Sequence, residues 1–253
     1  MKPDIIVATH VLNLQLDGRA VLDNVRLAVS RGRVTALVGP AGAGKSALLG
    51  VLSGNLSPCG GSVEIEGRNV AGMSPHVLNR LGVQYIGPPG PEQGARTVRE
   101  CIALGAQWHV RGHHAALAQA DEVARRLGLE FHLHKAAASL QPALRKRLAL
   151  ASAVARRAHL LLLDGILAGL SASERAWMVA TIRDLRADGM TVLMAERIMP
   201  CVAKVADDVL VLEDGKLIAQ GLPHAVSRDP AVFGAYAGNR PDPGRAARGP
   251  AHA

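Results

Sequence analysis

Eight consecutive residues have the types and spacing of a phosphate-binding loop. The pattern is G-x-x-x-x-G-K-[ST], in which glycines let successive backbone N–H groups point at phosphate oxygens, the lysine reaches the outer phosphates and the serine hydroxyl meets Mg²⁺. The residues are Gly39, Pro40, Ala41, Gly42, Ala43, Gly44, Lys45 and Ser46. We therefore expect this segment to bind the phosphates of a nucleotide, with Ser46 as one ligand of Mg²⁺.

The sequence on both sides of this loop fits that interpretation. Residues 34–38 before it are apolar and rich in β-branched side chains, which predicts a buried strand, and residues 46–52 after it read as the start of a helix. The N-terminus of such a helix adds its dipole to an anion site. A glycine-rich turn without a ligand is the alternative, and the flanking strand and helix argue against it.

An acidic residue in the expected place lies much further along the chain. Four leucines at 160–163 predict a short buried strand that delivers Asp164 to its carboxyl end. We expect Asp164 to share Mg²⁺ with Ser46, since carboxylate and hydroxyl oxygens suit that ion. The next residue is Gly165, where hydrolysis would want a carboxylate as general base. The sequence thus predicts nucleotide binding and poor hydrolysis.

Length and composition set the frame for these motifs. The chain of 253 residues can bury one substantial α/β core and has room for a subdomain. Its residues are 49% hydrophobic but only 2% aromatic. A core of Leu, Val, Ala and Ile is ordinary for a parallel sheet covered by helices. The three cysteines form no C-x-x-C pair, so we expect free thiols in a reducing compartment.

Charge and hydropathy bear on location and partners. The start of the chain lacks the pattern of a signal sequence, and no uncharged apolar run approaches the ~18 residues of a membrane span, so we expect a soluble, cytoplasmic protein. The formal net charge of +8 permits attraction to nucleic acid or to an anionic membrane. Because the charge is scattered and stacking aromatics are almost absent, a generally basic surface is the favoured interpretation.

The elements that must position the motifs can be read from periodicity and turn residues. Strands are predicted at 7–16, 25–29, 34–38, 61–67, 160–163 and 191–195, and a hairpin at 209–218 around Asp214 and Gly215. Segment 97–158 has helical spacing. A stiff loop is predicted at 88–94, and residues 239–253 cannot bury a core and are expected to be disordered.

This order of elements and motifs resembles an ATP-binding subunit of an ABC transporter, from residue 7 through residue 236. Residues 228–238, RDPAVFGAYAG, are similar to the D-P-x-V-x-x-A-Y-L-G tail of branched-chain amino acid importer subunits, and residues 52–61 also resemble that subfamily. The resemblance implies an α/β fold with a P-loop NTPase core of ABC type, an antiparallel β subdomain and a helical subdomain. It implies one domain over 1–238, with the helical subdomain inserted at about 95–158, and a tail at 239–253.

The resemblance also implies ligands, partners and a location. ATP and Mg²⁺ would lie between the phosphate loop and Asp164. The chain would dock beneath integral membrane permease subunits, as a cytoplasmic protein peripheral to the inner face of the cell membrane. It would form one half of a pair with a second ATP-binding subunit, either identical or different. No nucleic acid is expected, since a nucleic-acid-associated ABC protein would be expected to show a second nucleotide domain or zinc-type cysteine spacing.

Several positions depart from the family pattern. Leu16 stands where the family has the aromatic residue that stacks on adenine, and Pro88 where it has the glutamine that contacts Mg²⁺ and the attacking water. Gly165 replaces the general-base glutamate. Ser171 replaces an aspartate of the dimer loop, and Arg197 replaces the switch histidine. The signature L-S-G-G-Q is replaced by LQPAL at 140–144, where a proline lacks an N–H and an alanine adds a β-carbon. Glu196 is not an obvious replacement base. We identify no catalytic residue.

Two interpretations of function follow from these departures. The first is an importer subunit, for branched-chain amino acids or related small solutes, with impaired hydrolysis. The second is a non-hydrolysing nucleotide-binding scaffold or regulatory subunit whose partner provides turnover. Gene decay is a further alternative, because the chain degrades both contributions that a family dimer needs, its own nucleotide site and the signature it offers to its partner.

Histidines pose a separate question about metal. His109, His113 and His114 lie close together, and His132 and His134 follow. These residues could form a metal site if the two segments met in space. Gly112 interrupts the first group and no acidic or thiol ligand is regularly spaced with it, which favours surface histidines.

Overall fold

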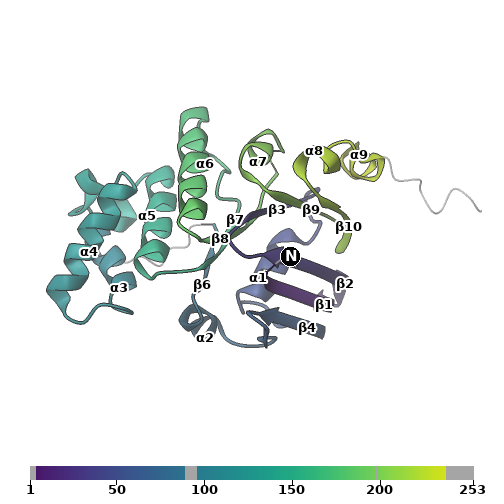
Figure 1. Cartoon of the computed structure of the whole chain (residues 1–253), viewed down its shortest axis with the longest axis horizontal. Coiled ribbons are helices and arrows are strands. Elements are labelled where there is room, and N and C mark those ends of the chain that lie inside the picture. The colour runs from purple at the N-terminus through teal and green to yellow at the C-terminus, as the bar shows by residue number, and fades with distance from the viewer. Residues whose placement is uncertain (1–3, 89–95, 198, 238–253) are drawn as a thin grey trace, which may run out of the picture.

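Two sheets with helices around them form the framework of the chain (Figure 1). The computed structural model describes residues 4–88, 96–197 and 199–237. A four-stranded sheet has the order β2-β1-β4-β5, and a six-stranded sheet has the order β10-β9-β3-β8-β7-β6. The predicted α/β architecture with an antiparallel sheet and a helical unit is confirmed.

The four-stranded sheet is antiparallel and is built on a long hairpin. Its strands are β1 (Ile5–Leu16), β2 (Arg19–Ser30), β4 (Gly60–Ile65) and β5 (Arg68–Asn69). A strand at 25–29 was predicted from apolar residues, but β2 begins at Arg19, which pairs with Leu16. Pairing with β1 across the turn at Asp17 and Gly18 extends the strand through residues 19–24, in which polar and apolar side chains are mixed.

The six-stranded sheet is parallel except at one edge, where β10 runs antiparallel to β9. Its strands are β3 (Val34–Val38), β6 (Val83–Ile86), β7 (Leu160–Asp164), β8 (Thr191–Ala195), β9 (Asp208–Glu213) and β10 (Lys216–Gly221). Every residue of β3 and β8 is buried, as expected of strands covered on both faces. The predictions at 34–38, at 160–163 and at 191–195, and that of the hairpin, are confirmed.

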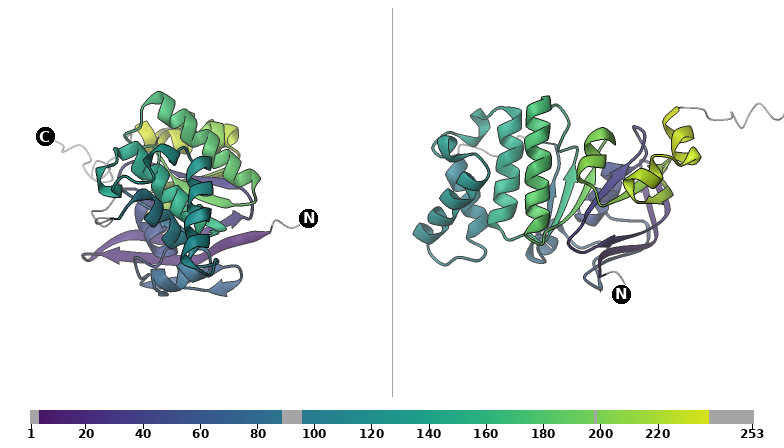
Figure 2. Two further views of the ribbon diagram at one scale, coloured as in Figure 1. Left: turned by 90° about the vertical axis from the view of Figure 1, so that its left-hand side faces the viewer. Right: turned by 45° about the horizontal axis from the view of Figure 1, so that its top comes forward.

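Helices cover the two faces of this sheet and form a separate group at one end. They are α1 (Lys45–Leu52), α2 (Pro75–Arg80), α3 (Val98–Ala106), α4 (His113–Arg126), α5 (Pro142–Ala155), α6 (Ala172–Ala187), α7 (Met199–Val205), α8 (Pro223–Val226) and α9 (Pro230–Ala237). The predicted helical segment 97–158 contains α3, α4 and α5, with short 3-10 turns at Glu130–His132 and Ala137–Ser139. Figure 2 shows these helices gathered away from the antiparallel sheet.

Helix α1 is enclosed between the two sheets. Leu48, Leu49 and Leu52 are fully buried and belong to one apolar cluster with residues of β1, β2, β7 and β8. Burial of such leucines contributes about 2 kcal/mol each. This packing fixes the N-terminus of α1, and with it the phosphate loop, against the edge of the six-stranded sheet.

Two predicted segments lie partly or wholly outside the described residues. Of the loop predicted at 88–94 only Pro88 is described, and the tail 239–253 lies outside the described residues. Cys59, Cys101 and Cys201 are free thiols. Within the described ranges, no helix has both the length and the apolar character needed to cross a bilayer.

Candidate functional site

Parallel pairing brings three loops to one edge of the six-stranded sheet. Ala195 at the end of β8 lies opposite Leu37 of β3 on one side and opposite Asp164 of β7 on the other. The ladder continues into the loops, since Glu196 N–H donates to Leu37 O at 3.1 Å and Gly165 N–H donates to Ala195 O at 2.9 Å. Carboxyl ends of parallel strands are where ligands bind in α/β sheets.

The first of these loops is the phosphate loop, which turns sharply between β3 and α1. Gly39 has φ +148°, and a β-carbon there would lie 2.0 Å from Leu212 O, so only glycine fits. Lys45, the first residue of α1, donates from Nζ to Gly39 O at 2.8 Å and to Pro40 O at 2.7 Å. Burial lowers the pKa of Lys45, the nearby charge of Arg197 lowers it further, and Asp164 opposes both.

The second loop begins with Asp164, whose two carboxylate oxygens each accept a hydrogen bond. Ser46 Oγ donates to Oδ1 at 3.1 Å, and the Tyr85 hydroxyl donates to Oδ2 at 3.1 Å. Burial, followed by the charge of Asp164, raises the pKa of Tyr85 to about 12, so this hydroxyl remains a donor at neutral pH. The structure thus brings the expected loop and Asp164 together. It adds Tyr85, which sequence reasoning did not identify.

Tyr85 reaches Asp164 because of its strand register and its neighbour. Tyr85 in β6 pairs with Leu162 in β7, two residues before Asp164. A β-carbon on Gly87 would lie 2.6 Å from the Tyr85 hydroxyl oxygen, so a side chain at residue 87 would require the end of the Tyr85 ring to shift. An aromatic residue two positions before a glycine, at the end of a neighbouring strand, was the signal available in the sequence.

The backbone after Asp164 is held by two charged side chains. Lys146 Nζ of α5 donates to the carbonyl oxygens of Gly165, Ile166 and Ala168 at 3.1, 2.9 and 2.5 Å. Glu196 Oε1 accepts the Leu167 N–H at 2.7 Å. Neither lysine nor glutamate was assigned this task from the sequence, because their partners are backbone groups of a distant segment.

Glu196 is engaged in this structural contact. It is only 3% exposed, and burial raises the pKa of its carboxyl group, opposed first by the Leu167 amide. Gly165 itself has φ +63° and carries no carboxylate. Around Asp164 the geometry therefore supplies donors and cations for phosphate, while the Glu196 carboxylate is bonded to the Leu167 amide.

The remaining departures from the family pattern occupy separate places. Ser171 is the N-cap of α6 and forms a capping box with Glu174, which gives its hydroxyl a structural role. Leu16 ends β1 and is 38% exposed. Gln141 caps α5 without a side-chain hydrogen bond, and Pro142 is the first residue of that helix.

The histidines do not converge in the part of the chain that the structure describes. No group of three His, Cys, Asp or Glu side chains suitable for a metal occurs there. His113 and His114 lie with ring centroids 6.2 Å apart, and His109 contacts the carbonyl oxygen of Arg156.

Comparison with known proteins assigns the family. The ABC transporter family model matches residues 22–168, more than half of the chain. The chain belongs to the ABC transporter family. The predicted fold class, with a P-loop core of ABC type, is thereby confirmed.

Relatives within the ABC family are named for the transport of different substances. The hemin import ATP-binding protein HmuV of Nocardia farcinica is 36% identical over 218 residues, covering 82% of this chain and 73% of that protein. The branched-chain amino acid transport protein BraF of Pseudomonas aeruginosa is 26% identical over 249 residues, covering 92% and 98%. Other relatives are longer: the chain spans 57% of the cobalamin import protein BtuD of Halobacterium salinarum, at 28% identity.

Solved structures agree on the fold. The ADP conformation of MJ1267, an ATP-binding cassette of an ABC transporter, superposes with a TM-score of 0.83 at 23% identity, covering 92% of this chain and 99% of that one. A nucleotide-free ATP-binding cassette gives the same TM-score. The ABC fold is thus shared over nearly the whole chain.

Proposed function

We propose that the chain binds ATP with Mg²⁺ at Gly39 to Ser46 and Asp164, as the ATP-binding subunit of an ABC importer. The observation that carries this proposal is the complete phosphate loop, fixed at the N-terminus of the enclosed helix α1 with Lys45 pointing into the loop. Backbone amides, a helix dipole and a lysine together form an anion site. Ser46 and Asp164 provide the oxygen ligands that suit Mg²⁺.

The direct test is calorimetric titration of the chain with Mg-ATP, beside the variant Lys45→Ala. We expect the variant to lose measurable binding, because its remaining amides and dipole must hold several negative charges without the lysine. Lys135→Ala is the matched control, since Lys135 is exposed and distant in sequence from the loop. Equal affinities in the parent and in Lys45→Ala would place the nucleotide elsewhere.

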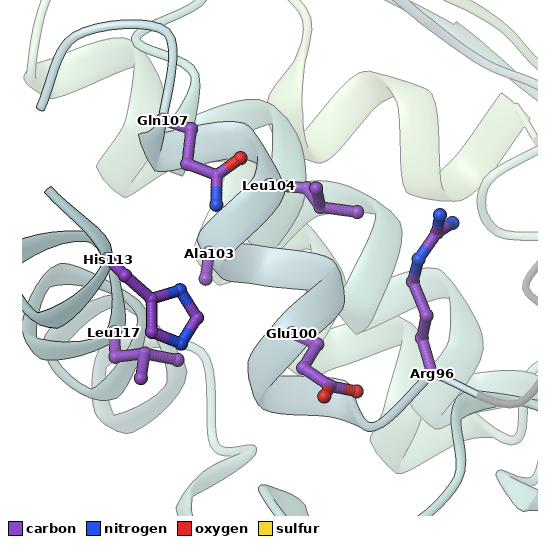
Figure 3. A pocket seen from close by; sticks show the side chains of 7 residues that line it. All are labelled: Arg96, Glu100, Ala103, Leu104, Gln107, His113 and Leu117. Atoms are coloured by element: carbon purple, nitrogen blue, oxygen red, sulfur yellow. The ribbon is translucent and has the colours of Figure 1, made fainter. Parts of the chain in front are cut away.

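The proposal includes docking on a membrane permease through the helical subdomain. We propose that residues 1–238 form a single domain and that this subdomain is inserted in it at about 95–158. A groove of about 610 Å³ lies on this subdomain (Figure 3). Ala103, Leu104 and Leu117 give it an apolar floor, and Arg96, Glu100, Gln107 and His113 add polar groups. A short amphipathic helix fits a groove of this character. The chain would then act on the inner face of the membrane, paired with an identical or different ATP-binding subunit.

Docking is tested by co-purification with permease subunits co-expressed from neighbouring genes. We expect Leu104→Glu to reduce recovery by about tenfold, because it places a charge on the apolar floor of the groove. Leu222→Glu is the matched control, since Leu222 is similarly exposed but lies outside the subdomain. Loss of recovery in both variants, or in neither, would contradict docking in this groove.

Branched-chain amino acids or related small solutes are the proposed cargo. The supports are the tail-like sequence at 228–238 and the similarity to BraF over nearly both full lengths. We further propose that hydrolysis is impaired, since Gly165 lacks a carboxylate and Glu196 is bound to Leu167 N–H. A non-hydrolysing scaffold or regulatory subunit is the second candidate, and steady-state phosphate release with an intact partner present distinguishes the two.

A further inference from the structure

A second groove lies between α6 and α7, on elements that the groove of the helical subdomain does not include. Figure 1 shows these two helices next to each other over the six-stranded sheet. This α6–α7 groove has a volume of about 380 Å³, and none of the described residues that line it is acidic. Basic side chains stand beside small or apolar ones; the lining residues are Arg175, Arg183, Lys204, Ala172, Ala176, Val179, Ala180 and Cys201.

The spacing of residues along α6 produces one wall of the α6–α7 groove. The six lining positions of α6 repeat every three or four residues, so they share one face of the helix. Large apolar side chains lie on another face, where Met178, Ile182 and Leu185 are buried in the core. The three lining alanines are exposed, and their short side chains leave the hollow between the two helices.

Backbone carbonyl groups hold the two arginines of the groove in place. Arg175 Nη1 donates to Leu170 O, and Arg183 Nη2 donates to Lys204 O, which joins α6 to α7. A guanidinium carries five N–H donors in a fixed fork, and each of these contacts engages one nitrogen. A carboxylate that binds the rest of the fork therefore meets a side chain whose position is already set, which lowers the entropy cost of binding.

Acidic residues of the same helices are directed to other contacts or other faces. Asp207, which follows α7, accepts a hydrogen bond from Arg186 at 2.8 Å. Glu174 accepts the Ser171 N–H at 2.7 Å in the capping box of α6. Asp184 belongs to α6 but does not line the groove. The charge that the described lining residues present to a ligand is therefore positive.

An apolar floor beside basic side chains fits an amphipathic helix that carries carboxylates along its apolar face. Arg175 and Arg183 lie on one face of α6, and their Cα atoms are about 12 Å apart along its axis. Carboxylates about two turns apart on a partner helix match this separation. Lys204 on α7 offers a third positive charge from the opposite wall.

We propose that the α6–α7 groove binds an acidic amphipathic helix of a partner protein, with apolar side chains on the alanine floor and carboxylates at Arg175, Arg183 and Lys204. Charge complementarity decides between occupants. The chain's own residues 239–253 contain three arginines and one acidic residue, so they do not match a basic groove. The inference goes beyond the proposed function, because it concerns neither the nucleotide site nor the groove on α3 and α4.

The test uses the full chain and two fluorescently labelled synthetic peptides of about 18 residues, long enough to form a helix. Both peptides have leucine and alanine on one face. The first carries glutamates two turns apart at the edges of that face, where the second carries glutamines. By fluorescence anisotropy we expect the glutamate peptide to bind at least about tenfold more tightly, and added salt to weaken it by screening the charges.

Lys204→Glu changes the groove and preserves the contact from Arg183, which is made to the backbone carbonyl of residue 204. We expect it to weaken binding of the glutamate peptide by about tenfold, because an attraction becomes a repulsion. Ala180→Glu, at an exposed position of the floor, should have a similar effect. Lys135→Glu is the matched control, since it makes the same change in net charge at an exposed lysine outside the groove.

Thermal melts establish that each variant is folded, and calorimetry with Mg-ATP is run on the same samples. Weaker peptide binding in Lys204→Glu and Ala180→Glu, with unchanged binding in Lys135→Glu, supports the proposal. Equal weakening in Lys204→Glu and Lys135→Glu overturns it, because the peptide then responds only to the net charge of the chain. The affinity for ATP should be the same in all variants, so failure of this proposal leaves the nucleotide site untouched.

Vesicles of phosphatidylserine and phosphatidylcholine, tested by co-sedimentation, provide the other arm. Failure of the glutamate peptide to bind overturns the proposal. If vesicles bind to the parent and not to Lys204→Glu while the peptide does not bind, the groove contacts an anionic membrane surface in place of a partner helix.

Discussion

The phosphate loop and the loop after Asp164 lie at the same sheet edge and differ in what their polar groups contact. Lys45 contacts carbonyl oxygens of its own loop, within six residues, and the loop's form depends on glycines set by its own sequence. The loop after Asp164 is held by Lys146 and Glu196, which come from α5 and from the residue after β8. The phosphate loop is arranged to receive an anion, whereas backbone groups of the loop after Asp164 are already bound by side chains of the protein.

This difference is the structural basis for the proposal that the site binds nucleotide but hydrolyses it poorly. Anion binding needs amides and cations that a contiguous motif supplies. Hydrolysis needs a free carboxylate and a water-orienting group placed by separate segments, and the family resemblance implies that Gly165 and Pro88 replace them here.

Gly39→Ala should be the most damaging change to the phosphate loop. Its β-carbon would lie 2.0 Å from Leu212 O, a backbone atom of β9, so the loop or the strand must move. We expect a loss of about 3 kcal/mol in the free energy of unfolding, measured by urea titration, together with loss of ATP binding. Gly42→Ala is the matched control, because no atom lies within 4 Å of a β-carbon there. Equal losses in both variants would show that conformation at φ > 0, and not the close approach, sets the cost.

Glu196→Ala should destabilise the loop after Asp164. The change leaves the buried Leu167 N–H without its acceptor and Lys146 without a nearby negative charge, which we expect to cost about 2 kcal/mol in the free energy of unfolding. Glu196→Gln keeps an acceptor oxygen and should cost less. A Glu196→Ala protein as stable as the parent would contradict the structural role of this residue.

The buried carboxyl group of Glu196 also predicts that the free energy of unfolding depends on pH. Burial raises the folded-state pKa of Glu196 above its usual 4.5. At a pH between 4.5 and the raised pKa, the folded protein therefore keeps a proton that the unfolded chain has released. The stability from this group is fully present below pH 4.5 and is lost as pH rises through the raised value. Relative to Glu196→Gln, the parent should therefore lose stability between acidic and neutral pH, and urea titrations across that range measure it.

Gly165→Glu should change ATP hydrolysis by less than about tenfold, below the 10² or more that an assembled base contributes. The new carboxylate would sit at φ +63°, and Pro88 and Arg197 would still lack the family's glutamine and histidine. Steady-state phosphate release should be compared with Gly165→Ala, which carries the same backbone strain of about 1 kcal/mol without a carboxylate.

A combined variant completes that comparison. It adds to Gly165→Glu the changes Pro88→Gln, Ser171→Asp, Arg197→His, Gln141→Ser, Pro142→Gly, Ala143→Gly and Leu144→Gln, which together restore the family pattern at every departure named above except Leu16. Substantial turnover by the parent, or a large gain from Gly165→Glu alone, would show that the departures are tolerated and that hydrolysis is not impaired.

Deletion of residues 239–253 should have the smallest effect. The segment lacks the apolar residues of a core, and the proposed docking groove lies on α3 and α4. We expect co-purification with the permease and the affinity for ATP to be unchanged. Loss of co-purification would give the segment a role in docking, and loss of affinity would give it a role in nucleotide binding.

Sequence reasoning succeeded where the deciding interactions are local. Residues 34–38 and 191–195 were predicted as strands with the observed bounds, because continuous apolar runs of that length suit strands buried on both faces. It was less accurate for β2, whose first half mixes polar and apolar residues and is ordered by pairing with β1, and it did not resolve segment 97–158 into three helices. Pairing and packing across the chain override local hydrophobicity in such places.

The phosphate loop, its flanking strand and helix, and the glycine after Asp164 can all be read from adjacent residues of the sequence. The groups that surround them depend on tertiary contacts. Tyr85 reaches Asp164 from a neighbouring strand, at a sequence separation of 79, and Lys146 and Glu196 hold a loop from two other elements. The physical reason is that hydrogen bonds and charge act over a few ångströms of space, and the strand register that brings those groups together has no local signal.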